Sequence, residues 1–144
     1  MLESFLPLHP RTVHFPIALT LVGVAFAALG LFRQRPQWIA YGQMNLLLGW
    51  LGALAAVATG LFDQSAAPQT PEVLAVINQH ISAGIALLVT IGLALYWPLR
   101  NKRLWSAGRS RWGYLALLLL IVALIAVEGW LGGRLVYGLG VGVH

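Results

Sequence analysis

The amino-acid sequence predicts an all-α protein, an integral membrane four-helix bundle that runs up-down-up-down. Its 144 residues are 59% hydrophobic and only 9% charged, and the mean hydropathy is +0.80. A soluble domain carries about a quarter charged residues. Four apolar stretches have the length needed to cross a bilayer, about 20 residues each. Because they take up most of the chain, we expect one transmembrane domain over residues 1–144 and no separate soluble domain.

The first predicted span runs from about Val13 to Phe32. Its Ala25-Phe26-Ala27 segment imitates the cleavage site of a signal peptide. However, the preceding residues include Glu3 and only one arginine, and the apolar run exceeds the roughly 7–15 residues of a signal peptide. We therefore expect a retained helix.

The second span, about Tyr41 to Phe62, follows the connection FRQRPQW. Its segment GWLGALAAVATG places small residues at helical spacing, which permits close helix packing or leaves room for a flat ligand. Ordinary membrane packing is the simpler interpretation. The small residues are Gly49, Ala53, Ala56 and Gly60.

The third span, about Val73 to Trp97, begins with a helix N-terminus signal in QTPEV. Thr70 is a suitable N-cap, Pro71 suits the first helical position, and Glu72 is favourable at the positive end of the helix dipole. We expect this helix to begin around Pro71 and to end in WPLRNKR.

The fourth span, about Trp112 to Leu131, follows RNKRLWSAGRSRW. After it comes GGRLVYGLGVGV, with five glycines in twelve residues. So much glycine disfavours a continuing helix. We expect a turn-rich tail that folds back over the outer end of the bundle.

Basic residues are concentrated in the first and third connections, and the net charge is +5. By the positive-inside rule these connections are cytoplasmic, so both termini would lie on the outer, periplasmic side of a bacterial inner membrane. We interpret the positive charge as a topology signal and expect no nucleic-acid partner. The basic residues are Arg33, Arg35, Arg100, Lys102, Arg103, Arg109 and Arg111.

The scarce polar residues gather near the outer ends of the predicted spans. His14 and His80 are the deepest histidines, and their spans are diagonal neighbours in an up-down-up-down bundle. Polar residues inside a membrane are costly and usually face the bundle interior, where they have partners. Two facing imidazoles are the axial ligands that a b-type haem needs. We therefore expect haem b between His14 and His80, with Gly84 on the face of His80 leaving room for the flat ring.

Each candidate also has a structural interpretation: His14 could cap the first span, and His80 could simply hydrogen-bond across helices. His9 is either a surface residue or a further ligand. Asp63 and Arg134 either form an ion pair, hold haem propionates or orient a ligand imidazole, and Glu128 either pairs within the bundle or relays protons. The predicted cofactor-binding residues are His14, His80, Gly84, Asp63, Arg134 and Tyr137, and the predicted metal ligands are His14, His80 and His9.

Four features of the chain resemble one bacterial family of four-helix membrane proteins, the family of domain of unknown function 2231. They are HPRTVHFPIAL near the start, TGLFD at the end of the second span, His80, and GWLGGRLVYGLGVGV. The resemblance covers essentially the whole chain. Similar members are often joined to or found beside c-type cytochrome modules, which implies a place in electron transfer. This chain contains no cysteine for attaching a c-type haem, so any electron transfer would use separate partners. The resemblance assigns motif positions to His9, Pro10, His14, Phe15, Pro16, Gly60, Asp63, His80, Gly132, Gly133, Tyr137 and Gly140.

Three hypotheses for the function remain open. The leading one is a small membrane b-type cytochrome that transfers single electrons between a membrane donor such as quinol and a periplasmic acceptor such as a c-type cytochrome. The second is a Zn, Cu or Fe ion bound at the outer rim by nitrogen and oxygen ligands. The third is an accessory structural subunit of a larger respiratory or photosynthetic complex. Since the sequence contains no catalytic triad or phosphate-binding loop, we expect an electron carrier or accessory subunit rather than an enzyme.

Overall fold

The computed structural model describes residues 9–101 and 108–142, and these residues form helices and turns without any strand. The all-α class predicted from the sequence is therefore confirmed. A short α1 (His9–Thr12) precedes α2, a 3-10 turn η1 (Gln64–Ala66) follows α3, and a π-helical turn η3 (Arg134–Gly138) extends α5. The long helices are α2 (His14–Phe32), α3 (Pro36–Asp63), α4 (Pro71–Arg100) and α5 (Arg109–Gly133).

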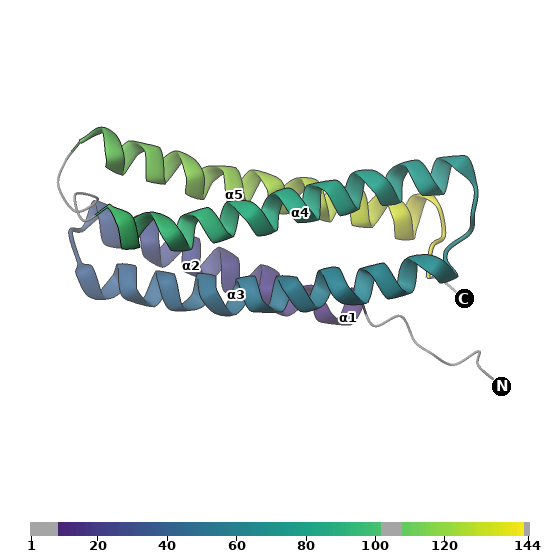
Figure 1. The fold of residues 1–144 in the computed structure, drawn as a ribbon, viewed down its shortest axis with the longest axis horizontal. Helices are drawn as coiled ribbons and strands as arrows, with labels where there is room; N and C mark the ends of the chain where they lie inside the picture. Colours follow the sequence, from purple (N-terminus) through teal and green to yellow (C-terminus); the bar gives the residue numbers. More distant parts are fainter. Residues whose placement is uncertain (1–8, 102–107, 143–144) are drawn as a thin grey trace.

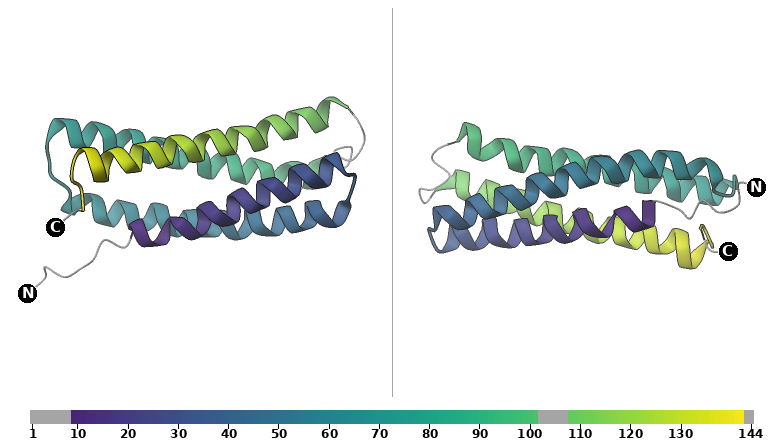
Figure 2. Two further views of the ribbon diagram at one scale, coloured as in Figure 1. Left: turned by 180° about the vertical axis from the view of Figure 1, so that it is seen from behind. Right: turned by 90° about the horizontal axis from the view of Figure 1, so that it is seen from below.

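The long helices pack as an antiparallel, up-down-up-down bundle (Figure 1). α2 and α4 each contact both α3 and α5, so α2 and α4 lie on a diagonal, as the sequence predicts. The α3–α4 connection lies at the same end as α1 and η3, and the α2–α3 turn lies at the opposite end (Figure 1 and Figure 2). We call the first the histidine end, after His9 and His80. We call the other the basic end, after its described arginines, Arg33, Arg35, Arg100, Arg109 and Arg111; Lys102 and Arg103 fall outside the described residues.

All four long helices are long and apolar enough to cross a membrane. α2 contains 19 residues, α3 contains 28 and α4 contains 30, and α5 together with η3 contains 30. Their outer faces expose large apolar side chains such as Val89 and Leu119. Lipid chains solvate such surfaces, and the helical backbone satisfies its own hydrogen bonds within the bilayer. The chain is therefore built as a multi-pass membrane protein.

The inward faces of the helices follow a repeat of about seven residues, which is two helical turns. On α5, Tyr114, Leu118 and Ile121 are buried. The hydroxyl of Tyr114 accepts a hydrogen bond of 2.6 Å from the side-chain amide of Gln43 on α3. Continuing the same repeat along α5 leads to Glu128, which therefore points into the bundle.

Glycines allow α2 and α3 to approach closely. A Cβ atom on Gly42 would lie 2.6 Å from the backbone nitrogen of Ala27, and one on Gly23 would lie 2.8 Å from that of Leu46. Such spacings exclude any side chain at these two glycines unless the helices move apart. Gly49 also packs against α2, so this part of the small-residue stripe serves helix packing.

The predicted start of α4 is confirmed. The helix begins at Pro71, and the hydroxyl of Thr70 accepts a hydrogen bond of 3.3 Å from the backbone nitrogen of Val73. α3 begins at Pro36, earlier than the predicted Tyr41, because a proline at the first helical position needs no hydrogen-bond donor.

The C-terminal segment differs from the predicted turn-rich tail. Helical winding continues through η3 to Gly138, and the chain reverses only at 139–142, where Gly140 and Gly142 have φ angles of 66° and 76°. Leu131 and Leu135 are buried on the inward face of this segment. Their packing outweighs the low helix propensity of the neighbouring glycines, which is why the helix does not stop where the sequence suggests.

Candidate functional site

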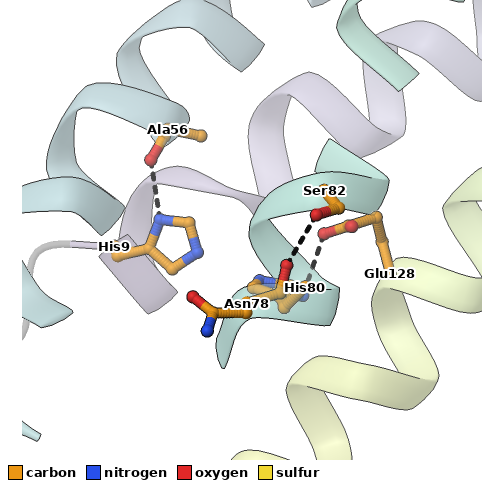
Figure 3. A network of polar contacts seen from close by, with 6 residues as sticks. All are labelled: His9, Ala56, Asn78, His80, Ser82 and Glu128. Carbon is orange, nitrogen blue, oxygen red and sulfur yellow. Dashed lines mark hydrogen bonds and ion pairs between the residues drawn. The ribbon is translucent and has the colours of Figure 1, made fainter. Parts of the chain in front are cut away.

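The imidazoles of His9 and His80 face each other at the histidine end (Figure 3). Their ring centroids are 5.9 Å apart, and the ring planes are nearly perpendicular, at 87°. His9 is half-buried on α1, and 20% of the His80 side chain is exposed on α4. The fold thus brings together two imidazoles that are far apart in the sequence.

Pro16 lies near the start of the first span, at the junction between α1 and α2. Because Pro16 has no N–H, the carbonyl of Thr12 lacks its helical donor, and α1 ends at Thr12, one residue before α2 begins. The Thr12 hydroxyl donates a 2.9 Å hydrogen bond to the carbonyl of His9. Val13 keeps helical φ and ψ angles of −68° and −29°, so α1 continues the winding of α2, and His9 is its first residue.

Two groups on α3 hold His9 in place. Its backbone nitrogen donates a hydrogen bond of 2.9 Å to Asp63 Oδ2, and its ring Nδ1 lies 2.8 Å from the carbonyl oxygen of Ala56. Because a carbonyl can only accept, Nδ1 carries the hydrogen. In the neutral ring the lone pair is then on Nε2, the nitrogen that remains available to a ligand or metal.

Glu128 holds the ring of His80 from the α5 side. His80 Nδ1 lies 3.0 Å from Glu128 Oε2, although the contact lacks the alignment of a regular hydrogen bond. Only 14% of the Glu128 side chain is exposed, and its Oε1 is buried without a hydrogen-bond partner in the described part of the chain. A carboxylate beside Nδ1 favours the tautomer that leaves Nε2 as the acceptor. We call His9, His80 and Glu128 the histidine–glutamate cluster.

Glycines from three helices adjoin this cluster. A Cβ atom on Gly60 would lie 3.1 Å from His9 Nδ1, and one on Gly132 would lie 3.7 Å from His80 Cε1. A Cβ atom on Gly84 would lie 3.8 Å from the carboxylate oxygens of Glu128. Gly84 is predicted to leave room for a flat ring beside His80, and in the structure an added Cβ would lie closest to Glu128.

The predicted pairing of His14 with His80 requires correction. The side chain of His14 is exposed, and the imidazole packed against His80 belongs to His9. The physical reason is direction: at about 100° per residue, five residues turn a side chain by roughly 140° around a helix. His14 is the deeper residue along the span, but His9 is the one that points inward.

The predicted ion pair between Asp63 and Arg134 also requires correction. Asp63 accepts the hydrogen bond from the His9 backbone, whereas Arg134 Nη2 lies 3.7 Å from Glu72 Oε1, in a loose pair of exposed side chains. Tyr137 on η3 is 91% exposed. Of the residues predicted beyond the histidines, Asp63 and Gly84 therefore adjoin the cluster, while Arg134 pairs with Glu72 and Tyr137 is exposed.

Sequence spacing also indicates the direction of His9, one of the predicted metal ligands, and of Glu128, predicted to pair within the bundle or to relay protons. His9 lies seven residues before the buried Pro16, and Glu128 lies seven residues after the buried Ile121. Since seven residues make about two helical turns, each shares the inward face of its helix. The depth of a residue in the membrane does not show whether its side chain points toward the bundle interior.

The cluster is poor in further metal ligands. Within the described residues, no three His, Cys, Asp or Glu side chains are grouped so that they could hold a metal ion. A groove of about 480 Å³ opens on α4 and α5, but neither histidine lines it. Its lining residues are Asn78, Gln79, Ser82, Ala83, Val127, Trp130 and Leu131.

Comparison with known proteins agrees with this architecture. Residues 5–144 match the family described as "predicted membrane protein (DUF2231)". No curated protein and no solved structure matches the chain. Because the match extends over nearly the whole sequence, the chain belongs to the DUF2231 family of membrane proteins.

Proposed function

We propose that this protein is a small membrane b-type cytochrome, in which His9 and His80 would hold a haem at the histidine end. The observation that carries the proposal is the facing pair of imidazoles, 5.9 Å apart at their centroids. Two nitrogens that share one metal are each about 2 Å from it, so the ligating atoms need a separation of roughly 4 Å. A centroid separation of 5.9 Å is compatible with one metal between the rings, provided that both rings turn Nε2 toward it.

The tautomers of both histidines support the same conclusion. The Ala56 carbonyl at His9 and the Glu128 carboxylate at His80 both engage Nδ1, on the outer sides of the pair (Figure 3). Ligating histidines typically donate their other ring N–H to such a carbonyl or carboxylate, which orients the ring and increases its basicity. Both rings are thus prepared to bind through Nε2.

The number of ligands favours haem over a bare ion. Structural zinc sites use four protein ligands and catalytic ones three. Within the described residues the cluster offers two facing imidazoles and no group of three ligands. A haem iron needs only axial ligands from the protein, because the porphyrin supplies the rest. The small residues Gly60, Gly84 and Gly132 keep side chains away from the cluster.

When bound, haem would supply one-electron chemistry, and the protein would hold and insulate it. His9 and His80 would fix the iron, while Asp63 and Glu128 would hold these ligands through the contacts described above. The surrounding apolar helices would exclude water. The donor we propose is a membrane quinol, and the acceptor a c-type cytochrome or another protein outside the bundle.

An absorption spectrum of the protein extracted from haem-supplemented cells tests the proposal. We expect a Soret band and a reduced α-band, both lost in His9→Ala and His80→Ala. His14→Ala is the matched control and should keep them, because its side chain is exposed. Equal elution volumes in size-exclusion chromatography would show that the variants fold.

Two results would contradict this assignment. A folded wild-type protein that stays colourless, even after addition of hemin, would refute haem binding. Stoichiometric zinc or copper without porphyrin absorbance would assign the two imidazoles to a bare ion instead.

A further inference from the structure

The basic end carries positive charge that no described carboxylate balances. Its described arginines are Arg33, Arg35, Arg100, Arg109 and Arg111. The described acids lie elsewhere: Asp63 and Glu72 are at the histidine end, and Glu128 is paired with His80. Among the described residues, Nε of Arg111 is buried without a hydrogen-bond partner, and its guanidinium lies 5.4 Å from the ring centroid of Phe32. Anions from outside the protein are the available counter-charges.

A groove of about 290 Å³ lies at this end, along the last turns of α4. Its lining residues recur at helical spacing and change from apolar to cationic toward the helix end. Leu93 comes first, Tyr96 and Trp97 follow, and Arg100 and Asn101 form the outermost part. Over seven residues, which is about 10 Å of helix, the groove thus passes from membrane-like to charged.

Hydrogen bonds to α5 fix the polar wall of the groove. The side-chain amide of Asn101 donates a 2.6 Å bond to the hydroxyl of Ser110, and the indole N–H of Trp97 lies 3.4 Å from the same hydroxyl. The guanidinium of Arg100 is exposed beside this wall. The groove therefore combines a held aromatic surface with an arginine at its mouth.

From these observations we propose that the groove binds one anionic phospholipid. Arg100 contacts the phosphate, Tyr96 and Trp97 flank the headgroup and glycerol region, and Leu93 contacts the upper acyl chain. A phospholipid changes from apolar to anionic along its length in the same order. Aromatic residues favour the membrane interface, and basic residues beside a transmembrane helix attract anionic headgroups. This site is independent of the haem proposal.

Native mass spectrometry of the detergent-purified protein tests the lipid site. We compare phosphatidylglycerol with phosphatidylcholine of the same acyl chains. The wild type should retain phosphatidylglycerol preferentially, and Arg100→Gln should bind it about fivefold more weakly. Arg109→Gln is the matched control, because it removes the same charge from the same end without lining the groove.

Each remaining outcome would overturn the proposal. Equal retention of the two lipids would show no preference for an anionic headgroup. Equal losses in Arg100→Gln and Arg109→Gln would show only a diffuse attraction to positive charge. Displacement of the lipid by an equal concentration of inorganic phosphate would identify a simple anion site.

Discussion

At the scale of single residues, the contact between His80 and Glu128 is the most consequential interaction in the molecule. Polar and ionisable side chains inside membrane spans are costly and usually carry function. Neither residue is easily replaced alone, because the remaining partner would be buried with an unsatisfied polar group. A double substitution to apolar residues removes both polar groups at once, and for buried pairs this is often neutral.

This reasoning predicts the outcome of a double-mutant cycle. Glu128→Leu should lower the free energy of unfolding by about 1–3 kcal/mol, because His80 Nδ1 loses its partner. The double variant His80→Leu with Glu128→Leu should recover part of the loss, with a coupling energy of about 0.5–2 kcal/mol. Unfolding in mixed detergent micelles measures all four proteins. Strictly additive effects would show that the two residues do not interact.

The sequence predicted the types of residue that form the site better than their particular positions in the chain. His80, Asp63 and Gly84 were found from their positions in the spans, and all three adjoin the cluster. The depth of His14 in the span favours it over His9, whereas the direction of the side chain around the helix favours His9. The contact of Asp63 with the His9 backbone joins the start of α1 to the end of α3, and spacing along the sequence does not reveal such a tertiary contact.

At the scale of elements, the packing of α2 on α3 depends on glycine. Where a Cβ would meet backbone atoms closer than 3 Å, as at Gly42 and Gly23, the partner cannot yield by a side-chain rotation. The two helices would have to separate along their length. The sequence allowed two interpretations of the small residues of α3, helix packing or room for a flat ligand. Gly49 packs against α2, which agrees with the first and simpler interpretation.

Two glycine-to-alanine substitutions should therefore behave differently. Gly42→Ala should lower the free energy of unfolding by about 1–3 kcal/mol through overpacking against Ala27. Gly129→Ala is the control within α5, where a Cβ would meet nothing within 4 Å. It should be neutral or raise stability by up to about 1 kcal/mol, because alanine favours the helix. Thermal unfolding in detergent distinguishes them, and equal effects would refute the close packing described here.

At the scale of the whole molecule, composition and hydropathy were sufficient to predict four spans and their order. The apolar stretches need no partner to be recognised, since the bilayer fixes their length. Element ends were less predictable where tertiary packing decides, as in the continuation of α5 through η3. The side of the membrane that each end of the bundle faces depends on both the protein and its membrane. The cytoplasmic location of the basic end therefore stays a prediction.

Reporter fusions test this orientation. Alkaline phosphatase, active only in the periplasm, should be active when fused after the C-terminal residue His144 and inactive when fused in the connection at 33–35. A fluorescent protein that matures only in the cytoplasm should show the reverse pattern. The positive-inside rule gives the reason, because the arginine-rich connections remain on the cytoplasmic side. The opposite activities would invert the assignment of both ends.

The separation of charge along the bundle also makes the molecule sensitive to the membrane potential. The basic end carries five described arginines, whereas Asp63 and Glu72 lie at the other end together with Arg134, so positive charge is concentrated at one end and the bundle is an electric dipole parallel to its helices. One elementary charge crossing the full membrane changes energy by about 2.3 kcal/mol per 100 mV. In an energised bacterial membrane, negative inside, this dipole is stabilised with its arginines toward the cytoplasm. A membrane potential that is negative on the cytoplasmic side therefore favours the same insertion that the charged connections predict.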